Sequence, residues 1–224
     1  MVRREAWLGI FLLIALSALG AGCGLGAAQQ LPVDPVGTGD LKPAQRDPDA
    51  GVVTVRSGFE LRKYRAIAIV QFPVTDSGVM NKEEVRLLLT MPFYFQTRLV
   101  GRLRETRMFT SVEPVKEGTA LPTADGTLRL EGRITRLAAG DDTSMWVPFS
   151  GYSRLGDRMK AQIETSLVDA RTGQVMVVTA DRREAPNPGN QTAESYVQDS
   201  FEAMARDLVK FLERLGKGEA ARTN

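Results

Sequence analysis

The chain has 224 residues, and its 29 Lys and Arg against 27 Asp and Glu leave a formal net charge of +2 at pH 7. This balance does not indicate a nucleic-acid partner. The sequence contains no histidine and one cysteine, which excludes Ser-His-Asp and Cys-His catalytic arrangements as well as zinc or copper sites built from Cys and His. We therefore expect a protein that is not an enzyme, with no catalytic, cofactor-binding or metal-binding residues.

The first 22 residues have the order of a secretory signal peptide. Arg3 and Arg4 precede an apolar run over residues 6–19, and three small residues stand directly before Cys23. This arrangement resembles the lipobox of bacterial lipoproteins, with Gly20 where leucine is usual. The resemblance implies cleavage before Cys23 and acylation of its thiol, which would attach the chain to the lipid bilayer. An uncleaved anchor and a plain export signal remain as alternatives.

Residues 23–50 are expected to form an acylated cysteine followed by a disordered tether. They contain four prolines, several glycines and no apolar periodicity, so they bury too little apolar surface to offset the entropy of ordering. The alternative is a disordered remnant without a spacing role. A single domain is expected over residues 51–216, followed by a disordered tail over residues 217–224.

The domain is expected to begin with two strands and a helix. Val52, Val53 and Val55 indicate a short strand, and residues 66–72 form a compact apolar run typical of a buried strand. The helical pattern starts near residue 81 with a capping box before apolar residues at 85, 88 and 89. Pro92 interrupts it, so we expect a short first helix or a break, with the main helix restarting at Pro92.

The main helix should lay one apolar face on the sheet, because Phe95, Leu99 and Leu103 recur at four-residue spacing. Its opposite face carries four arginines. They could bind anionic headgroups or simply be solvated, and we favour solvation. These residues are Arg98, Arg102, Arg104 and Arg107.

The second half of the domain predicts a strand, a hairpin and a long helix. Alternation marks a strand over residues 128–134, where Gly132 indicates a bulge or a close backbone contact. Strands over residues 161–167 and 175–179 should be joined by a turn at residues 169–173. The last helix should begin after Thr192 and end at Gly216. Its apolar stripe comprises Val197, Phe201, Ala205, Leu208, Leu212 and Leu215.

This element order predicts an α/β fold, an α+β sandwich with a mixed sheet of about five strands and two helices packed on one face. The other sheet face could be solvated, or it could bind partners or further copies of the chain. The segment over residues 140–156 is unusually aromatic for a loop and could be a partner contact or a cover over the core. Its candidate contact residues are Trp146, Phe149 and Tyr152.

Carboxylates are the only acid–base groups left for catalysis. The candidates are Asp141, Asp142, Asp169 and Asp181. Turn formation or solvation explains each of them more simply. The glycine-flanked Ser153 does not have the spacing of a nucleophile elbow, and the sequence holds no histidine to activate it.

Five segments together resemble an uncharacterised family of bacterial envelope lipoproteins, a domain of unknown function. They are RAIAIVQF, RLRETRMFTSVEPV, LRLEGRITRL, SLVDARTGQVMVV and DSFEAMARDLVKFLERL. The α/β domain of that family is similar to those of the curli-secretion lipoprotein and of the lipoprotein activators of penicillin-binding proteins.

The resemblance implies a non-enzymatic, membrane-anchored lipoprotein that binds or supports another envelope protein. The alternative is a self-assembling structural subunit of an envelope or secretion complex. Gly24, where an aspartate would favour the inner membrane, implies a periplasm-facing protein of the outer membrane.

Overall fold

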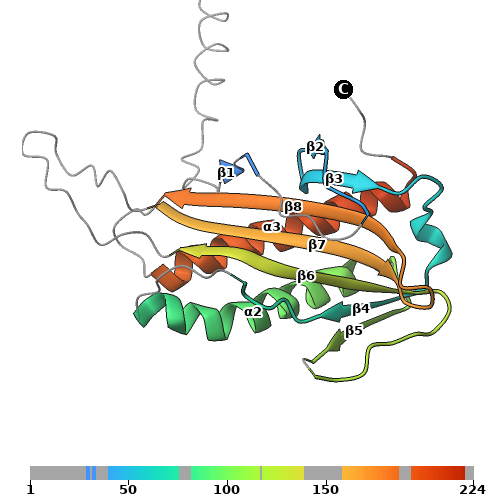
Figure 1. Cartoon of the computed structure of the whole chain (residues 1–224), viewed down its shortest axis with the longest axis horizontal. Coiled ribbons are helices and arrows are strands. Elements are labelled where there is room, and N and C mark those ends of the chain that lie inside the picture. The colour runs from blue at the N-terminus through green and yellow to red at the C-terminus, as the bar shows by residue number, and fades with distance from the viewer. Residues whose placement is uncertain are drawn as a thin grey trace, which may run out of the picture.

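The computed structural model describes residues 29–30, 32–33, 40–75, 82–116, 118–138, 158–186 and 193–219. In these ranges the chain forms one mixed sheet with two long helices on one of its faces (Figure 1). The helices are α2 (Lys82–Thr106) and α3 (Ala193–Gly216), with a short 3-10 turn η1 (Leu61–Lys63). The strands are β1 (Gln29–Gln30), β2 (Gln45–Asp47), β3 (Gly51–Val55), β4 (Ala66–Val70), β5 (Ser111–Val115), β6 (Thr127–Ala138), β7 (Arg158–Asp169) and β8 (Val175–Pro186). The expected α+β sandwich is confirmed.

Seven strands follow one another in the order β2-β3-β8-β7-β6-β4-β5, and β1 pairs with β8 beyond the part that pairs with β3. β4 is parallel to β5 and β6, whereas the other pairs are antiparallel. The expectation of about five strands is therefore too low. The strands that the sequence pattern missed, β1, β2 and β5, have only two to five residues. They form because the strands beside them have unpaired edges, not because their own residues alternate.

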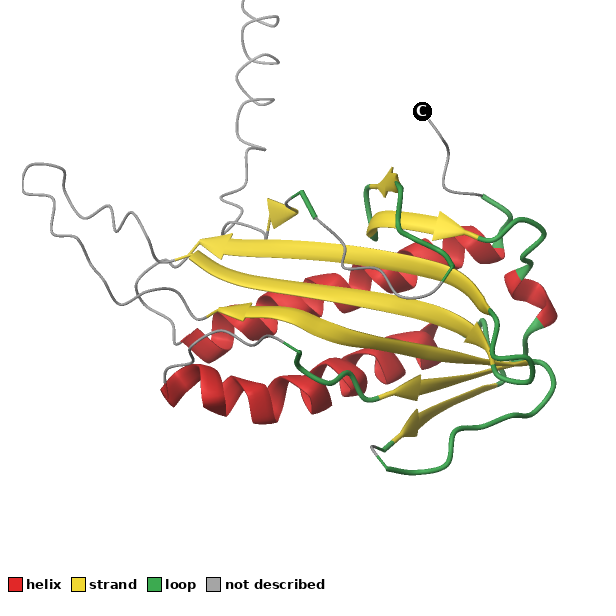
Figure 2. Ribbon diagram, in the orientation of Figure 1, coloured by secondary structure: helices red, strands yellow, loops and turns green. Residues whose placement is uncertain are grey.

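The centre of the sheet is formed by β6, β7 and β8, which have 12 residues each (Figure 2). The predicted hairpin between β7 and β8 is confirmed. The carboxylate of Asp169 accepts hydrogen bonds from the backbone N–H of Thr172 at 2.7 Å and from its hydroxyl at 2.9 Å. Gly173 then takes a φ of 71°, which lets the chain reverse within the turn.

Helix α2 continues through Pro92, so the expected break or restart at this residue is wrong. A proline inside a helix lacks one hydrogen-bond donor and crowds the carbonyl four residues earlier, at a cost of about 3 kcal/mol. Leu87 and Met91 before Pro92, and Phe95 after it, are all buried in the same core. Burial stabilises by about 1.5–3 kcal/mol per side chain, which outweighs the local cost.

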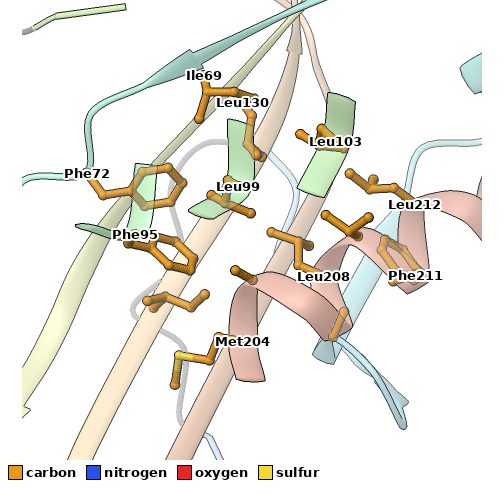
Figure 3. Close-up of a cluster of buried hydrophobic side chains, with 14 of the residues drawn as sticks. Ile69, Phe72, Phe95, Leu99, Leu103, Leu130, Met204, Leu208, Phe211 and Leu212 are labelled. Carbon is orange, nitrogen blue, oxygen red and sulfur yellow. The ribbon is translucent and has the colours of Figure 1, made fainter. Parts of the chain in front are cut away.

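The core lies between the two helices and the sheet (Figure 3). Phe95 of α2 contacts Phe72 edge-on, with ring centroids 5.1 Å apart, and Phe201 of α3 at 5.3 Å. The predicted apolar faces of both helices are confirmed, because Leu99 and Leu103 are fully buried and no residue of the α3 stripe is more than 9% exposed. In the described part of the chain, neither helix is long and apolar enough to cross a membrane.

Gly132 provides the room for this packing. A Cβ atom at this position would lie 2.2 Å from Cε1 of Phe72 and 2.4 Å from the backbone oxygen of Glu164. The predicted close contact is therefore confirmed, whereas the register shift of β6 lies further along, between Ile134 and Arg136.

Residues 40–50 belong to the folded domain, and we name this segment the strap. β2 pairs with β3, and Asp47 at the end of β2 is only 3% exposed. The guanidinium of Arg214 on α3 donates to both carboxylate oxygens of Asp47, at 2.7 and 2.8 Å. The domain boundary expected at residue 51 is therefore wrong, and residues 40–50 are not part of a disordered tether. Composition did not indicate this, because the strap is held mainly by the Asp47–Arg214 ion pair and by pairing with β3, and Ala50 is its only residue in the described apolar core.

Candidate interaction surface on helix α2

Most of the site residues predicted from the sequence lie outside the residues that the structure describes. Their expected roles stay predictions: lipid attachment for Cys23, partner contact for the three aromatic residues, turn formation or solvation for the two aspartates, and helix capping for Thr192. These residues are Cys23, Trp146, Phe149, Tyr152, Asp141, Asp142 and Thr192.

The two described carboxylates among the catalytic candidates have structural partners. Asp169 closes its turn and accepts a hydrogen bond from the Tyr64 hydroxyl at 2.8 Å. Burial and this bond raise the pKa of Tyr64 to about 12, while hydrogen bonds, first from the Thr172 backbone, lower the pKa of Asp169. Asp181 is buried and accepts from Nε of Arg183 at 3.1 and 2.9 Å. Burial raises the pKa of Asp181 despite this partner.

Arg183 and Asp181 belong to a larger charged cluster that joins β8, α3 and the strap. A second guanidinium nitrogen of Arg183 lies 3.2 Å from the carboxylate of Asp207, and a third donates to the backbone oxygen of Asp49. Burial alone would raise the pKa of Asp207, but hydrogen bonds from Arg206 and Lys210 hold it below its usual value. The acidic and basic side chains of this cluster pair with one another, so the cluster connects β8, α3 and the strap.

Three of the four arginines predicted for this helix also hold the fold together, whereas the fourth, Arg107, lies just after the end of α2 at a φ of 56°. Arg98 and Arg102 both bind Glu202 of α3. Arg104 donates two hydrogen bonds, at 3.1 and 2.8 Å, to the backbone oxygen of Val112 in β5. The arginine face is therefore neither freely solvated nor an open anion site, because it connects α2 to α3 and caps an edge strand.

A groove of about 450 Å³ crosses the sheet face opposite the helices. Its lining comes from β6, β7 and β8, together with Pro43 of the strap and Pro73 and Thr75 after β4. Arg133 and Glu164 form an ion pair of 2.7 Å within it. A ligand that used either charge would have to replace this pair, so the groove is the weaker candidate for a binding site.

The outer side of α2 carries an exposed apolar row at four-residue spacing. Val85 is 49% exposed, Leu89 74% and Phe93 65%. Residues four apart lie above one another on one helix face, so these three side chains form a continuous stripe. Among the described residues, the only other large apolar side chain that is exposed is Leu121. Exposed apolar side chains gathered in one place are typical of a protein contact.

The same row continues into small residues, and we name the five residues Val85, Leu89, Phe93, Thr97 and Gly101 the α2 ridge. The Thr97 hydroxyl donates to the carbonyl oxygen of Phe93 at 2.9 Å, so it needs no outside partner. Apart from neighbouring residues and the backbone of the helix itself, no described atom lies within 4 Å of the place where a Cβ of Gly101 would sit. A glycine in a helix interior costs about 1 kcal/mol relative to alanine, and the packing within this chain does not explain it.

The sequence contained part of the signal for this ridge, because Val85 and Leu89 belong to the helical pattern that follows the predicted capping box. That pattern did not say which side of the helix they occupy. The structure places Leu87 and Met91 in the core, and Val85 and Leu89 point outward. A helix with apolar residues on two sides reveals its free side only when its packing partner is known.

The chain matches no family model and no curated protein. Several solved structures resemble parts of it. The PelC dodecamer from Paraburkholderia phytofirmans is 14% identical, over 70% of this chain and 96% of that chain, with a TM-score of 0.45. A DUF330 protein from Xanthomonas campestris is 8% identical, over 80% and 98%, with a TM-score of 0.47. A Caulobacter crescentus protein described as a lipoprotein is 14% identical, over 73% and 95%, with a TM-score of 0.29.

With TM-scores below 0.5, these likenesses identify neither a family nor a function for the chain. The expected similarity to the curli-secretion lipoprotein and to the activators of penicillin-binding proteins stays a prediction.

Proposed function

We propose that the chain is an exported lipoprotein, held at the outer membrane by acylated Cys23, whose domain acts by binding another envelope protein and not by catalysis. The observation that carries the binding function is the α2 ridge. Three of the four exposed large apolar side chains of the described residues lie on its first half.

The ridge is suited to binding because α2 is held rigidly from behind. Its inner face is part of the core, and Arg102 ties it to Glu202 of α3. Burying the exposed parts of Val85, Leu89 and Phe93 would contribute about 4 kcal/mol, at roughly 1.5–3 kcal/mol for a whole side chain. This is a useful share of a protein–protein affinity, with polar contacts at the rim supplying the remainder.

The non-enzymatic function is supported by what the described carboxylates do. Asp169 closes a turn and binds Tyr64, and Asp181 is paired with Arg183. Neither is presented to a substrate. The sequence offers no histidine as an alternative general base.

Photo-crosslinking in cells tests the binding function. A photoreactive residue in place of Leu89 is expected to attach the full chain to a protein, because this side chain is the most exposed of the three large apolar side chains of the ridge. The matched control carries the same photoreactive residue in place of Thr123, which is exposed in a loop away from α2. Equal labelling from both positions, or none from Leu89, would contradict a binding function for the ridge.

Mass spectrometry of the mature amino terminus tests the anchor. The expected product begins at Cys23 and carries acyl chains. A chain that begins at Met1, or one whose Cys23 thiol is free, would show that the lipoprotein proposal is wrong.

Self-assembly is the second candidate function, and one observation favours it. The α2 ridge has a half with large side chains and a half with small ones, so two copies of the same helix can fit together.

A further inference from the structure

We propose that the partner of the α2 ridge is the same ridge of a second copy of this chain, packed antiparallel about a two-fold axis near Thr97. This inference rests on the proposed function, that the ridge is a protein contact, and it names the occupant of that contact.

The first reason is the shape of the ridge. The large side chains of Val85, Leu89 and Phe93 project from its first half. Its second half projects less, because Thr97 is small and Gly101 has no side chain. A two-fold axis at Thr97 places residues whose numbers sum to 194 opposite each other. Phe93 of one copy then lies over Gly101 of the other, where the structure leaves space for a side chain. Small residues at such a position let two helix backbones approach closely.

The second reason is charge. Arg86 flanks the apolar half, and its side chain is 70% exposed although it contacts Glu194. Glu105, which continues the ridge beyond Gly101, is exposed. By the same rule Glu105 of one copy lies opposite Leu89 of the other, one helical turn from Arg86, so each Arg86 can pair with a Glu105 across the contact in place of, or in addition to, its own Glu194. The two helix dipoles also run in opposite directions, which is favourable.

The size of the contact sets its strength. The part of α2 from Val85 to Glu105 has 21 residues, about 30 Å of helix. A single helix pair of this length buries less than the roughly 1,200 Å² of an ordinary stable interface. We therefore expect a weak dimer that forms when copies are concentrated, as on one membrane surface.

Disulfide trapping tests this arrangement in cells. The full chain with Thr97→Cys is expected to form a disulfide-linked dimer on mild oxidation, because the two-fold axis brings the two Thr97 positions together. The matched control is Thr123→Cys, and the parent chain reports any linkage through Cys23. We expect at least ten times more dimer from Thr97→Cys than from either control, and at least tenfold loss of this dimer when Phe93→Asp is added.

The outcomes separate this inference from the function on which it rests. One outcome would show that the partner is not a second copy but leave the binding function intact. In this outcome Thr97→Cys gives no more dimer than the controls, and Leu89 crosslinks to a different protein. Leu89 crosslinks to lipid alone, or to nothing, would overturn both. Trapped dimer that Phe93→Asp leaves unchanged would also overturn the proposed packing, because Phe93 must enter the space beside Gly101.

Discussion

Phe93 and Phe95 provide a direct comparison between an exposed and a buried ring on the same helix. Phe95 is fully buried and contacts two other rings, so Phe95→Ala is expected to lower the free energy of unfolding by about 3–5 kcal/mol. Phe93 is 65% exposed, and only about a third of its ring is removed from water by folding. Phe93→Ala should therefore cost less than about 1 kcal/mol.

Urea unfolding of the two full-length variants, followed by circular dichroism, measures both values. The same Phe93→Ala chain should lose the photo-crosslink from Leu89, although it folds normally. A loss of about 2 kcal/mol or more in Phe93→Ala would refute the reasoning, because a ring that contributes so much to folding is not available to a partner. Unchanged crosslinking from Leu89 would show that Phe93 is not part of the contact.

Three further predictions concern the fold. Gly132→Ala should lower the free energy of unfolding by about 3 kcal/mol, because its Cβ would overlap a ring and a backbone oxygen; an unchanged melting temperature would contradict this. Asp47→Ala should cost about 2–4 kcal/mol, because Arg214 loses its carboxylate, and limited proteolysis should then cut the strap; continued resistance would show that other contacts hold it. The pKa of Tyr64 should be about 12 in the parent chain and closer to its usual 10.0 in Asp169→Asn. The absorbance of tyrosinate measures this pKa, and Tyr64→Phe identifies the signal that comes from Tyr64. Since folding raises this pKa, its stabilisation is complete below about pH 10 and is lost as the pH rises toward 12; identical titrations would contradict the Tyr64–Asp169 bond.

The regular elements that the sequence predicted correctly are those whose pattern is local. The alternation in β6 and β7, the turn at Asp169 and the stripe of α3 each depend on neighbours within one strand, one turn or one helix. The break expected at Pro92 failed for the opposite reason. Its local cost was judged correctly, but core packing on both sides of the proline outweighs it.

The candidate site was less predictable than the fold. The arginines of α2 were expected to be solvated, but two of them bind Glu202, which is 100 residues or more further along the chain. The strap was read as disordered because its composition is polar, and only the position of Arg214 shows that Asp47 has a partner. Contacts between residues so far apart leave no periodic signal in the sequence.

The sequence by itself determined the fold class, the hairpin and the apolar faces of the main helices. The absence of histidine also excluded catalytic sites that depend on it, such as Ser-His-Asp and Cys-His arrangements. These are properties of composition and of short-range periodicity. Only the tertiary structure decided that the strap belongs to the domain and that Val85, Leu89 and Phe93 face outward. The physical reason is that an apolar side chain on a helix is buried or exposed according to where the sheet and the second helix lie, and their position is set by the whole chain.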